Sequence, residues 1–428
     1  MTSATTTRQV YAIAKKSKAN RGGATGADTV SHLQAIEELL GRLGHPLRAL
    51  VTECDLCARL LLEHFRSPLA LKSHVKAVVA AMKLGALPKT PEAEARWVSA
   101  LAAASDEEKL VRERILQVLA RSPKKASQET LVRYADSLAQ ALSKLNARNP
   151  NAVVDPGSVE KLRAACTSRN TFQNHAAVML IFFDASPGLK ESHPESHKAW
   201  TKAVAAEKER SLKESRSNAP SSSRQAENFV AMHEWRRALA TLEEQADPHA
   251  TLRASQIIVW ITYTCTVPPT RADLGALRVF DSEPSEEEVE RHPNHVILAA
   301  EPKLVVGQFK TSKDRAPIVE VLPAELLEVI LESFDRHPRT HLFENAKGEP
   351  FTRKGFSKWA IAVSNGLFGK GAGPSLLRHA FCTDLDFNKL TLAQRDEIAE
   401  RMGHSSAQQE QYRFLTLQPN SEYRRVSL

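Results

Sequence analysis

The sequence has little of several features that define particular protein classes. Only 6% of its 428 residues are aromatic, so it does not predict a stacking surface for single-stranded nucleic acid. It has no apolar run of about 18 residues, and residues 1–18 contain no apolar core followed by a small-residue cleavage site. We therefore expect no membrane span, no secretory signal and an intracellular location, which would be nuclear if the host is a eukaryote.

Cysteine is also scarce. Five cysteines are scattered over the whole length, a pattern typical of a reducing compartment and not of a disulfide scaffold. Cys54 and Cys57 form a single CxxC, but a zinc site needs a second ligand pair and none is nearby. The simpler interpretation is two small residues on a helix, and we expect neither a metal nor a cofactor.

The charge has an excess of one sign. The formal net charge is +8 and the isoelectric point is about 9.2. Lysine and arginine neutralise phosphates, so a polyanionic partner fits this balance, although many soluble proteins are mildly basic.

The pattern along the chain predicts several segments. Residues 1–27 show no apolar period and read as a disordered basic tail. Helical spacing of alanine and leucine runs from 28 to about 206. Residues 207–226 are charged and then serine-rich, which predicts a linker. From 227 to 428, short β-strand signals near 279–280, 295–298, 304–309 and 318–322 are flanked by helical patterns, which predicts a small antiparallel sheet among helices.

An internal similarity runs through the helical part at an offset of about 101 residues. His74 and His175 each open a helix rich in alanine and valine, and Trp97 and Trp200 each precede a later alanine-rich stretch. Local spacing slips by one or two residues, and chance similarity among alanine-rich helices is the competing explanation. The similarity predicts two stacked helical modules, residues 28–115 and 125–206, with the first a duplicate of the second.

The last 160 or so residues contain the groups that a metal-free transesterification on DNA needs. Two guanidiniums would stabilise the charge on the phosphate oxygens, a phenol can attack and leave again, and a general acid would protonate the departing 5′ oxygen. These groups occur in a fixed order along the chain: Arg271 after a turn, Lys310 at a hairpin tip, Arg378 on a helix, His404 in Gly-His-Ser, and then Tyr412.

This ordered set resembles the catalytic domain of the tyrosine recombinases, the phage-integrase family, over residues 227–428. The Pro-Pro-x-Arg form around Arg271 is similar to recombinases of eukaryotic DNA viruses and crypton-like transposons. Taken singly, each residue has an ordinary structural explanation, such as a surface ion pair for Arg271 or a solubilising hairpin residue for Lys310. The order of the whole set carries the resemblance.

The resemblance implies a role for each matching residue. Arg271 and Arg378 clamp the phosphate, Lys310 is the general acid, His404 hydrogen-bonds the phosphate, and Tyr412 is the nucleophile. Lys313 is the alternative general acid. Asp273, close to Arg271, is a further candidate.

One position departs from the family pattern. The family has histidine three residues before the second arginine, and this chain has Ser375. Serine accepts a proton less readily than imidazole, so a DNA-binding relative with weakened catalysis stays open as an alternative. An enzyme like the type IB topoisomerases is a second alternative, because those enzymes share the catalytic set. His379, next to Arg378, is structural in the family.

The resemblance also implies an architecture and partners. The expected fold is a multidomain one, with all-α N-terminal DNA-binding modules followed by a mixed α+β catalytic domain. The segment 125–206 resembles the family's helical core-binding domain. The expected partner is double-stranded DNA, bound by a homotetramer that exchanges strands through a Holliday junction, with no small-molecule cofactor.

Overall fold

The structure is a computed structural model that describes residues 10–13, 26–122, 126–186, 188–245, 247–270, 272–309, 312 and 315–417. The chain divides into two compact units, Met1–Arg210 and Ser211–Leu428. None of the helices within these ranges is both long and apolar enough to cross a bilayer.

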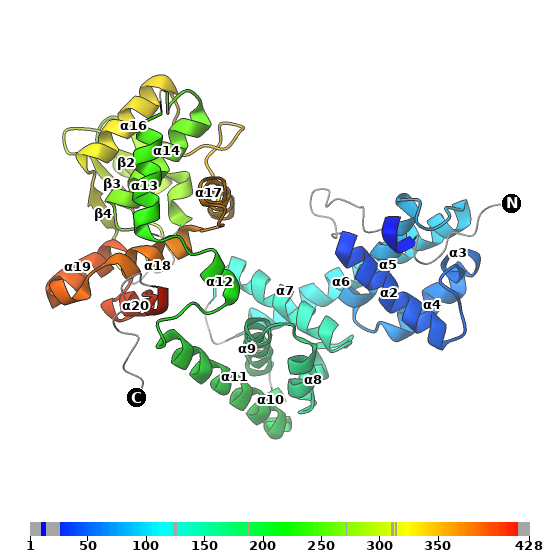
Figure 1. The fold of residues 1–428 in the computed structure, drawn as a ribbon. Helices are drawn as coiled ribbons and strands as arrows, with labels where there is room; N and C mark the ends of the chain where they lie inside the picture. The colour runs from blue at the N-terminus through cyan, green and yellow to red at the C-terminus, as the bar shows by residue number, and fades with distance from the viewer. Residues whose placement is uncertain are drawn as a thin grey trace. The chain divides into compact units, whose positions relative to one another are not determined.

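The first unit begins with five helices around one apolar core (Figure 1). They are α2 (Gly26–Arg42), α3 (Ala49–Thr52), α4 (Cys54–His64), α5 (Pro68–Lys83) and α6 (Pro91–Leu119). Most of the predicted tail lies outside the described residues, but residues 10–13 are helical and Val10 is buried in this core. That short piece therefore differs from the disordered tail that the sequence predicts, because its apolar side chains find a partner surface. Cys57 is buried in the same core, and its burial raises its pKa to about 11.

A second set of helices in the same unit follows the same order. It contains α7 (Gln128–Lys144), the 3-10 turn η1 (Pro150–Val154), α8 (Ser158–Ala165), α9 (Arg169–Ala185), the short α10 (Leu189–Ser192) and α11 (Pro194–Ser215). Trp97 of α6 donates its indole N–H to the Leu50 carbonyl at 2.7 Å. Trp200 of α11 donates likewise to the Val153 carbonyl at 2.9 Å. In both bonds the donor and the acceptor are 47 residues apart in the sequence. The acceptors lie in α3 and η1, which are the second elements of their sets.

Buried positions also correspond between the two sets. Pairs that are both buried include Ile36 with Leu138, Leu40 with Leu142, Leu71 with Phe172, Val78 with Met179 and Met82 with Phe183. The turns correspond as well, since Gly44 and Asn146 follow α2 and α7 and both have a positive φ, 82° and 50°. The two sets therefore share the order of their helices and the positions of several buried residues, and the duplication itself stays a prediction.

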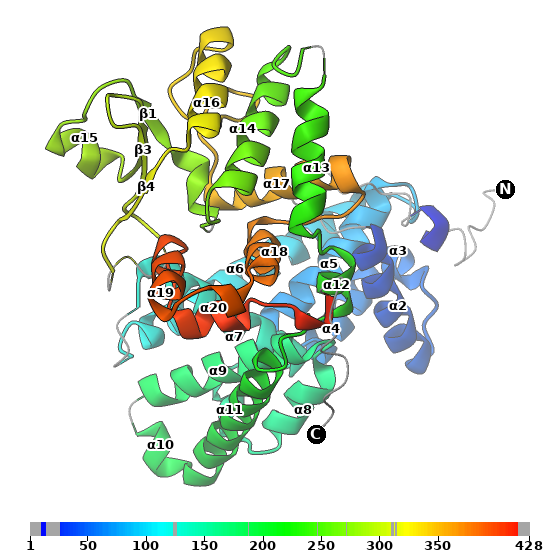
Figure 2. The ribbon, with the colours of Figure 1, turned by 60° about the vertical axis from the view of Figure 1, so that its left-hand side comes forward.

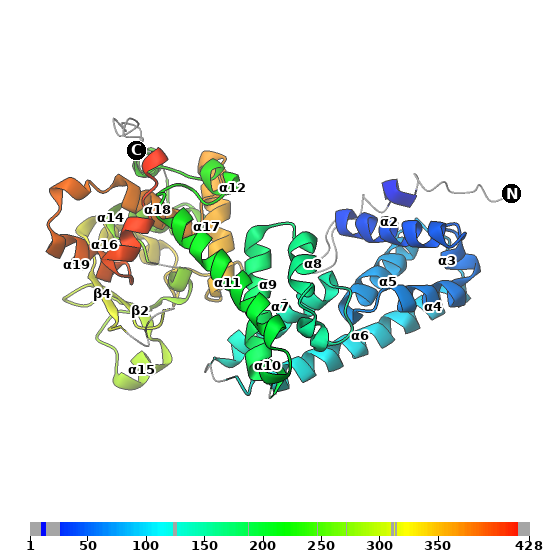
Figure 3. The same cartoon turned by 90° about the horizontal axis from the view of Figure 1, so that it is seen from below.

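Helix α6 belongs to both cores. Its first part packs in the first core, while Ile115 and Leu119 lie in the second (Figure 3). Lys72 of α5 reaches Glu108 of α6 at 2.6 Å, and Arg112 joins Glu108 at 3.0 Å to Asp136 of α7 at 2.8 Å. The boundary expected near 115–125 is thus spanned by a helix that both modules share.

The predicted linker is also more ordered than its composition suggests. Helix α11 continues to Ser215, and α12 (Ser223–Glu227) follows after a turn. Glu207 is buried because it pairs with Arg163 at 2.7 Å and Arg169 at 3.4 Å. Its charge is therefore compensated inside the module, and the linker begins later than predicted.

The second unit places four short strands among helices, as predicted. The strands are β1 (Arg278–Phe280), β2 (Asn294–Ile297), β3 (Lys303–Val306) and β4 (Ile318–Val321), in spatial order β1-β2-β3-β4. The antiparallel prediction is wrong for one pair, since β1 runs parallel to β2, with Val279 beside Val296. The sheet is mixed because α15 (Glu286–Arg291) lies between β1 and β2 in the chain and allows the strand direction to repeat.

Helices pack around this sheet to form the largest core of the unit (Figure 1). The helices that contribute to this core are α13 (Met232–Glu243), α14 (Leu252–Thr266), α16 (Ala324–Arg336), α17 (Arg353–Phe368) and α18 (Pro374–Asp384). Helices α19 (Leu392–Arg401) and α20 (Ser406–Gln411) follow α18 in the chain. The described residues of this unit also include the short 3-10 turns η2 (Ala272–Ala276), η4 (Phe387–Lys389) and η5 (Leu415–Leu417). Trp260 of α14 is buried against Phe356 and Phe343, so α14 runs through an aromatic centre.

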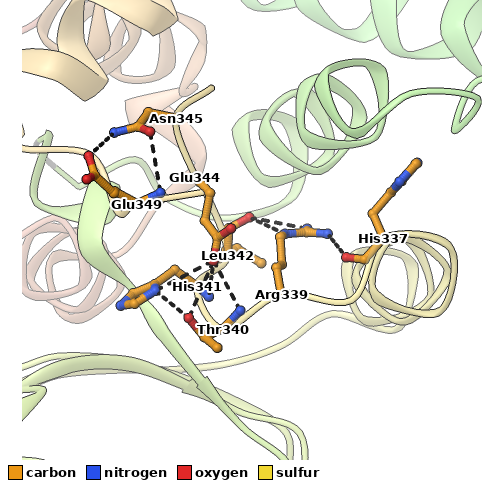
Figure 4. Close-up of polar contacts among 8 residues, drawn as sticks. All are labelled: His337, Arg339, Thr340, His341, Leu342, Glu344, Asn345 and Glu349. Carbon is orange, nitrogen blue, oxygen red and sulfur yellow. Dashed lines mark hydrogen bonds and ion pairs between the residues drawn. The ribbon is translucent and has the colours of Figure 1, made fainter. Parts of the chain in front are cut away.

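The loop after α16 supports the open edge of β1 (Figure 4). Arg339 donates to the carbonyls of Ser333 and His337, both at 3.0 Å, and to the carbonyl of Leu342 at 3.3 Å. Burial lowers the pKa of Arg339 to about 10. The Leu342 N–H donates to the Leu277 carbonyl at 2.9 Å, so the loop holds the end of η2 beside β1.

Candidate active site

Arg378 lies at the centre of the site with almost no exposed surface. Pro374 begins α18, where its fixed φ suits the first helical turn, and Leu377 and Ala380 bury one face of the helix. The Arg378 Nη1 donates to the Met402 carbonyl at 2.8 Å and to the Pro269 carbonyl at 3.3 Å. A buried guanidinium needs such partners. Arg378 therefore joins the chain just before Arg271 to the turn that carries His404.

His404 is placed by the end of α19. Gly403 has a φ of +69°, and the N–H of His404 donates to the Ala399 carbonyl at 3.0 Å, which closes the helix. A Cβ at Gly403 would also meet Ile318 at 3.0 Å, so both backbone and packing require glycine. The His404 Nδ1 donates to the Ser405 carbonyl at 3.0 Å, which orients the imidazole.

Helix α19 is itself held against the sheet. The Arg401 Nε donates to the Glu320 carboxylate at 2.8 Å, and Glu320 is nearly buried on β4. Arg315, on the segment before β4, donates to the His404 carbonyl at 3.1 Å. The hairpin and the His404 turn are thus fixed to each other by charged groups.

Tyr412 meets these residues at the end of α20. The Arg378 guanidinium carbon lies 4.9 Å from the centre of the Tyr412 ring, and the His404 ring centre lies 5.3 Å from it. Ser405 caps α20 by accepting the Gln408 N–H, so a short helix separates His404 from Tyr412. The structure therefore brings together three of the predicted residues. Figure 2 shows their helices, α18, α19 and α20, gathered in orange and red.

His379 is the residue that contacts Tyr412 most closely. Its Nδ1 donates to the Tyr412 carbonyl at 2.8 Å, and its ring stacks on Phe414 with a centroid distance of 4.1 Å. Burial lowers the pKa of His379 to about 4, so the imidazole is neutral at physiological pH. Its neighbour Arg378 identifies the helix in the sequence, but only the contact shows that His379 holds the backbone of Tyr412.

Three predicted residues, Arg271, Lys310 and Lys313, lie outside the described residues. Two residues that adjoin them, Thr270 and Phe309, are described. Thr270 is buried and its N–H donates to the Tyr263 hydroxyl at 3.3 Å. Phe309 lies against Gly403, 3.4 Å from where a Cβ would stand.

Asp273 and Ser375 have different environments. Asp273 lies in η2, where its carboxylate is 3.4 Å from the Arg353 Nε of α17, and its carbonyl accepts from Asn294 at 3.1 Å. These contacts make Asp273 an anchor of the segment after Arg271. Ser375 is exposed on the first turn of α18, and the described contacts of Tyr412 do not include it.

Two residues of the predicted linker, Asn218 and Gln225, also reach this site. Asn218 donates its side-chain amide to the Glu410 carbonyl at 2.7 Å, and Gln225 lies 3.4 Å from the His379 Nε2. Composition marks this stretch only as unable to form a core, so no local signal predicts these long-range contacts.

Among the described residues, no group of three or more His, Cys, Asp or Glu side chains is arranged to hold a metal ion. The site instead brings the Arg378 guanidinium and the His404 imidazole to the ring of Tyr412. Such groups can hold an anion such as a phosphate between them.

Comparison of the sequence with models of protein families gave no match, and comparison with curated proteins gave none either. Among solved structures, the crystal structure of XerA recombinase covers 70% of this chain and 92% of its own, at 15% sequence identity and a TM-score of 0.30.

Proposed function

We propose that the protein is a tyrosine recombinase that cleaves and rejoins DNA through a 3′-phosphotyrosyl intermediate. The observation that carries this proposal is the convergence of Arg378, within α18, with His404 and Tyr412, which follow the ends of α19 and α20. An arginine and a histidine beside a phenol form a phosphate-binding pair next to a nucleophile that can also leave.

The chemistry balances without an external energy source. The Tyr412 phenol gives its proton to water and its oxygen attacks the scissile phosphorus, so that a phosphotyrosyl bond forms and the bond to the 5′ oxygen breaks. Lys310, or Lys313 in its place, gives a proton to that oxygen, while Arg271 and Arg378 stabilise the added charge. A 5′ hydroxyl of the partner strand then attacks the phosphotyrosine and releases Tyr412, so the number of phosphodiester bonds is unchanged.

The wider assignment follows from the same proposal. The helical unit binds duplex DNA, and four copies of the chain act on two duplexes through a Holliday junction. The Pro-Pro-x-Arg sequence before Asp273 favours a role in the integration or transposition of mobile DNA, with action in the nucleus if the host is a eukaryote.

The test is capture of the covalent intermediate. A duplex that the full chain selects from a random pool is nicked near the binding site, so that cleavage releases a short fragment and cannot be reversed. We expect a DNA–protein adduct that survives denaturing gels with the native chain, and none with Tyr412→Phe, which should bind the same duplex equally well. Adduct formation by Tyr412→Phe would place the nucleophile elsewhere.

A second function is favoured by one observation. Ser375 is exposed and occupies the position of the expected proton acceptor, which suits a DNA-binding relative that has lost its chemistry. Specific binding without any adduct from the native chain would support this alternative and overturn the first.

A further inference from the structure

The turn between α11 and α12 contacts the segment that carries Tyr412 on both sides. The Asn218 side chain donates to the Glu410 carbonyl at 2.7 Å, and the Asn218 carbonyl accepts the Leu415 N–H at 2.9 Å. Asn218 has a φ of 50°, a left-handed conformation that asparagine tolerates better than most residues. One residue of the linker thus frames Tyr412 between two hydrogen bonds.

A second contact reaches Tyr412 through His379. Because the His379 Nδ1 donates to the Tyr412 carbonyl and the imidazole is neutral, its Nε2 is an acceptor. The Gln225 side-chain amide of α12 lies 3.4 Å from that Nε2 and is its donor. The Gln225 side-chain oxygen accepts the Ser221 N–H at 2.7 Å, which fixes the amide orientation. A line of hydrogen bonds therefore runs from the linker to the backbone of Tyr412.

The residue two positions after Tyr412 completes the attachment. Phe414 is buried, its N–H donates to the Thr383 hydroxyl at 2.9 Å, and its ring lies 5.5 Å from that of Phe229, just after α12. The tyrosine segment is thus docked within its own chain, partly on α18 and partly on the linker.

We propose that Asn218 and Gln225 are positioning residues that set the place of Tyr412, so that the linker couples the helical unit to the nucleophile. The proposal rests on the proposed function, because it gives Tyr412 the role of nucleophile. Only two residues separate Ser215, the end of α11, from Asn218. Three residue steps span at most about 10 Å, so a displacement of α11 beyond that reach pulls on Asn218 or unwinds the helix.

The proposed coupling predicts that a displacement of α11 changes the position of Tyr412. A shift of the last turn of α11 is transmitted to the hydrogen bonds that frame Tyr412. Formation of those bonds favours the cleaving position, and their loss frees the tyrosine segment. Asn218 would thereby act on the reaction without touching the DNA.

The first experiment compares Asn218→Ala and Asn218→Gly with Ser223→Ala, an exposed residue of the same linker. Hydrogen exchange of the peptide containing residues 410–417 is measured on the full chain without DNA. Single-turnover adduct formation is measured at saturating nicked duplex, with the affinity determined separately. We expect Asn218→Ala to speed exchange at Leu415 and to slow adduct formation by about tenfold, the factor for one net hydrogen bond, at unchanged affinity. Asn218→Gly keeps the left-handed backbone and its carbonyl, so it should retain the Leu415 protection better than Asn218→Ala.

Gln225→Glu provides a second and independent variant. It keeps the oxygen that accepts from Ser221 but replaces the donor to His379 with a carboxylate, which favours the protonated imidazole. The His379 pKa, followed by NMR, should therefore rise from about 4.

The outcomes separate this inference from the proposed function. Unchanged exchange at 410–417 in both Asn218 variants, or adduct rates that match Ser223→Ala, would overturn the positioning role. A native chain that gives no adduct defeats the recombinase assignment alone, because hydrogen exchange and the His379 pKa still decide whether the linker holds the tyrosine segment.

Discussion

Burial controls the chemistry of individual residues around Tyr412. Two backbone carbonyls accept from the buried Arg378 guanidinium, whereas burial lowers the pKa of His379 to about 4 although its hydrogen bond to the Tyr412 carbonyl acts in the opposite direction. The same buried environment thus contains a guanidinium beside the Tyr412 ring and a neutral imidazole that holds the Tyr412 backbone.

The low pKa of His379 predicts a pH dependence of stability. Its pKa is about 4 in the folded chain against a reference value of 6.5, so the unfolded chain binds more protons between these values. The free energy of unfolding should therefore fall as the pH drops from 6.5 towards 4, by up to about 1.4 kcal/mol per pH unit from this group. His74, whose pKa is also lowered to about 4, adds to the same slope.

Urea unfolding of the full chain between pH 4 and 7 would measure this dependence. His379→Asn should flatten the acid side of the curve, while His233→Asn, which changes an exposed histidine of α13, serves as the control. Equal changes of slope in the two variants would contradict the assignment.

Ser375 predicts a gain of activity. Because it is exposed on the first turn of α18, Ser375→His adds an imidazole without burying it. A general base contributes about 100-fold or more to a proton transfer when it is well placed. We expect adduct formation to be kept or raised by Ser375→His and unchanged by Ser375→Ala, measured with the nicked duplex. Loss of the adduct in both variants would show that the serine itself is required.

At the scale of elements, the two helical modules pack their helices in a similar way. Each closes its core with an indole that donates to a carbonyl of a short helical turn, and each ends its first helix with a left-handed residue. The exposed residues do not repeat in the same way, as Lys76 in α5 corresponds to Ala177 in α9. The core pattern is shared because it specifies the fold, while the surfaces are free to differ.

A matched pair of substitutions tests this equivalence. Trp97→Phe and Trp200→Phe each remove the indole donor and leave a buried carbonyl without it, which should cost about 1–3 kcal/mol apiece. Urea unfolding followed by circular dichroism should show similar shifts in the transition of the first unit for both variants. Trp359→Phe, on α17 of the second unit, should leave that transition in place. A shift for only one of Trp97 and Trp200 would contradict equivalent roles.

At the scale of the whole molecule, the described residues of the candidate site all come from one chain. Arg378, His404 and the docked Tyr412 segment all belong to the same unit. We therefore expect cleavage in cis, by the tyrosine of the chain whose arginine holds the phosphate.

Mixing two inactive variants would distinguish this from cleavage in trans. Arg378→Ala lacks the clamp and Tyr412→Phe lacks the nucleophile, so neither chain alone has a full site. In cis, the mixture should form no adduct on the nicked duplex. An adduct that appears only in the mixture would show that a tyrosine acts in the site of another copy.

Local patterns in the sequence were sufficient for much of the fold. The helices of the first unit follow from apolar spacing and from caps such as Ser127 and Ser168, and the four strands follow from short apolar runs between turns. The order of Arg378, His404 and Tyr412 along the chain also indicated which residues would meet. These features are local, so each can be recognised in a short stretch of sequence.

The direction of β1 and the attachment of the linker depended on contacts between distant residues. β1 pairs in parallel with β2 because the connection between them contains α15, which allows the chain to return in the same direction. The hydrogen bonds of Asn218 to Glu410 and Leu415 join segments almost 200 residues apart in the sequence. A serine-rich stretch has no apolar period to show such a partner, because hydrogen bonds of this kind leave no pattern in the sequence. The chain therefore encodes its elements and its reactive residues locally, whereas the position of Tyr412 arises only when the folded segments meet.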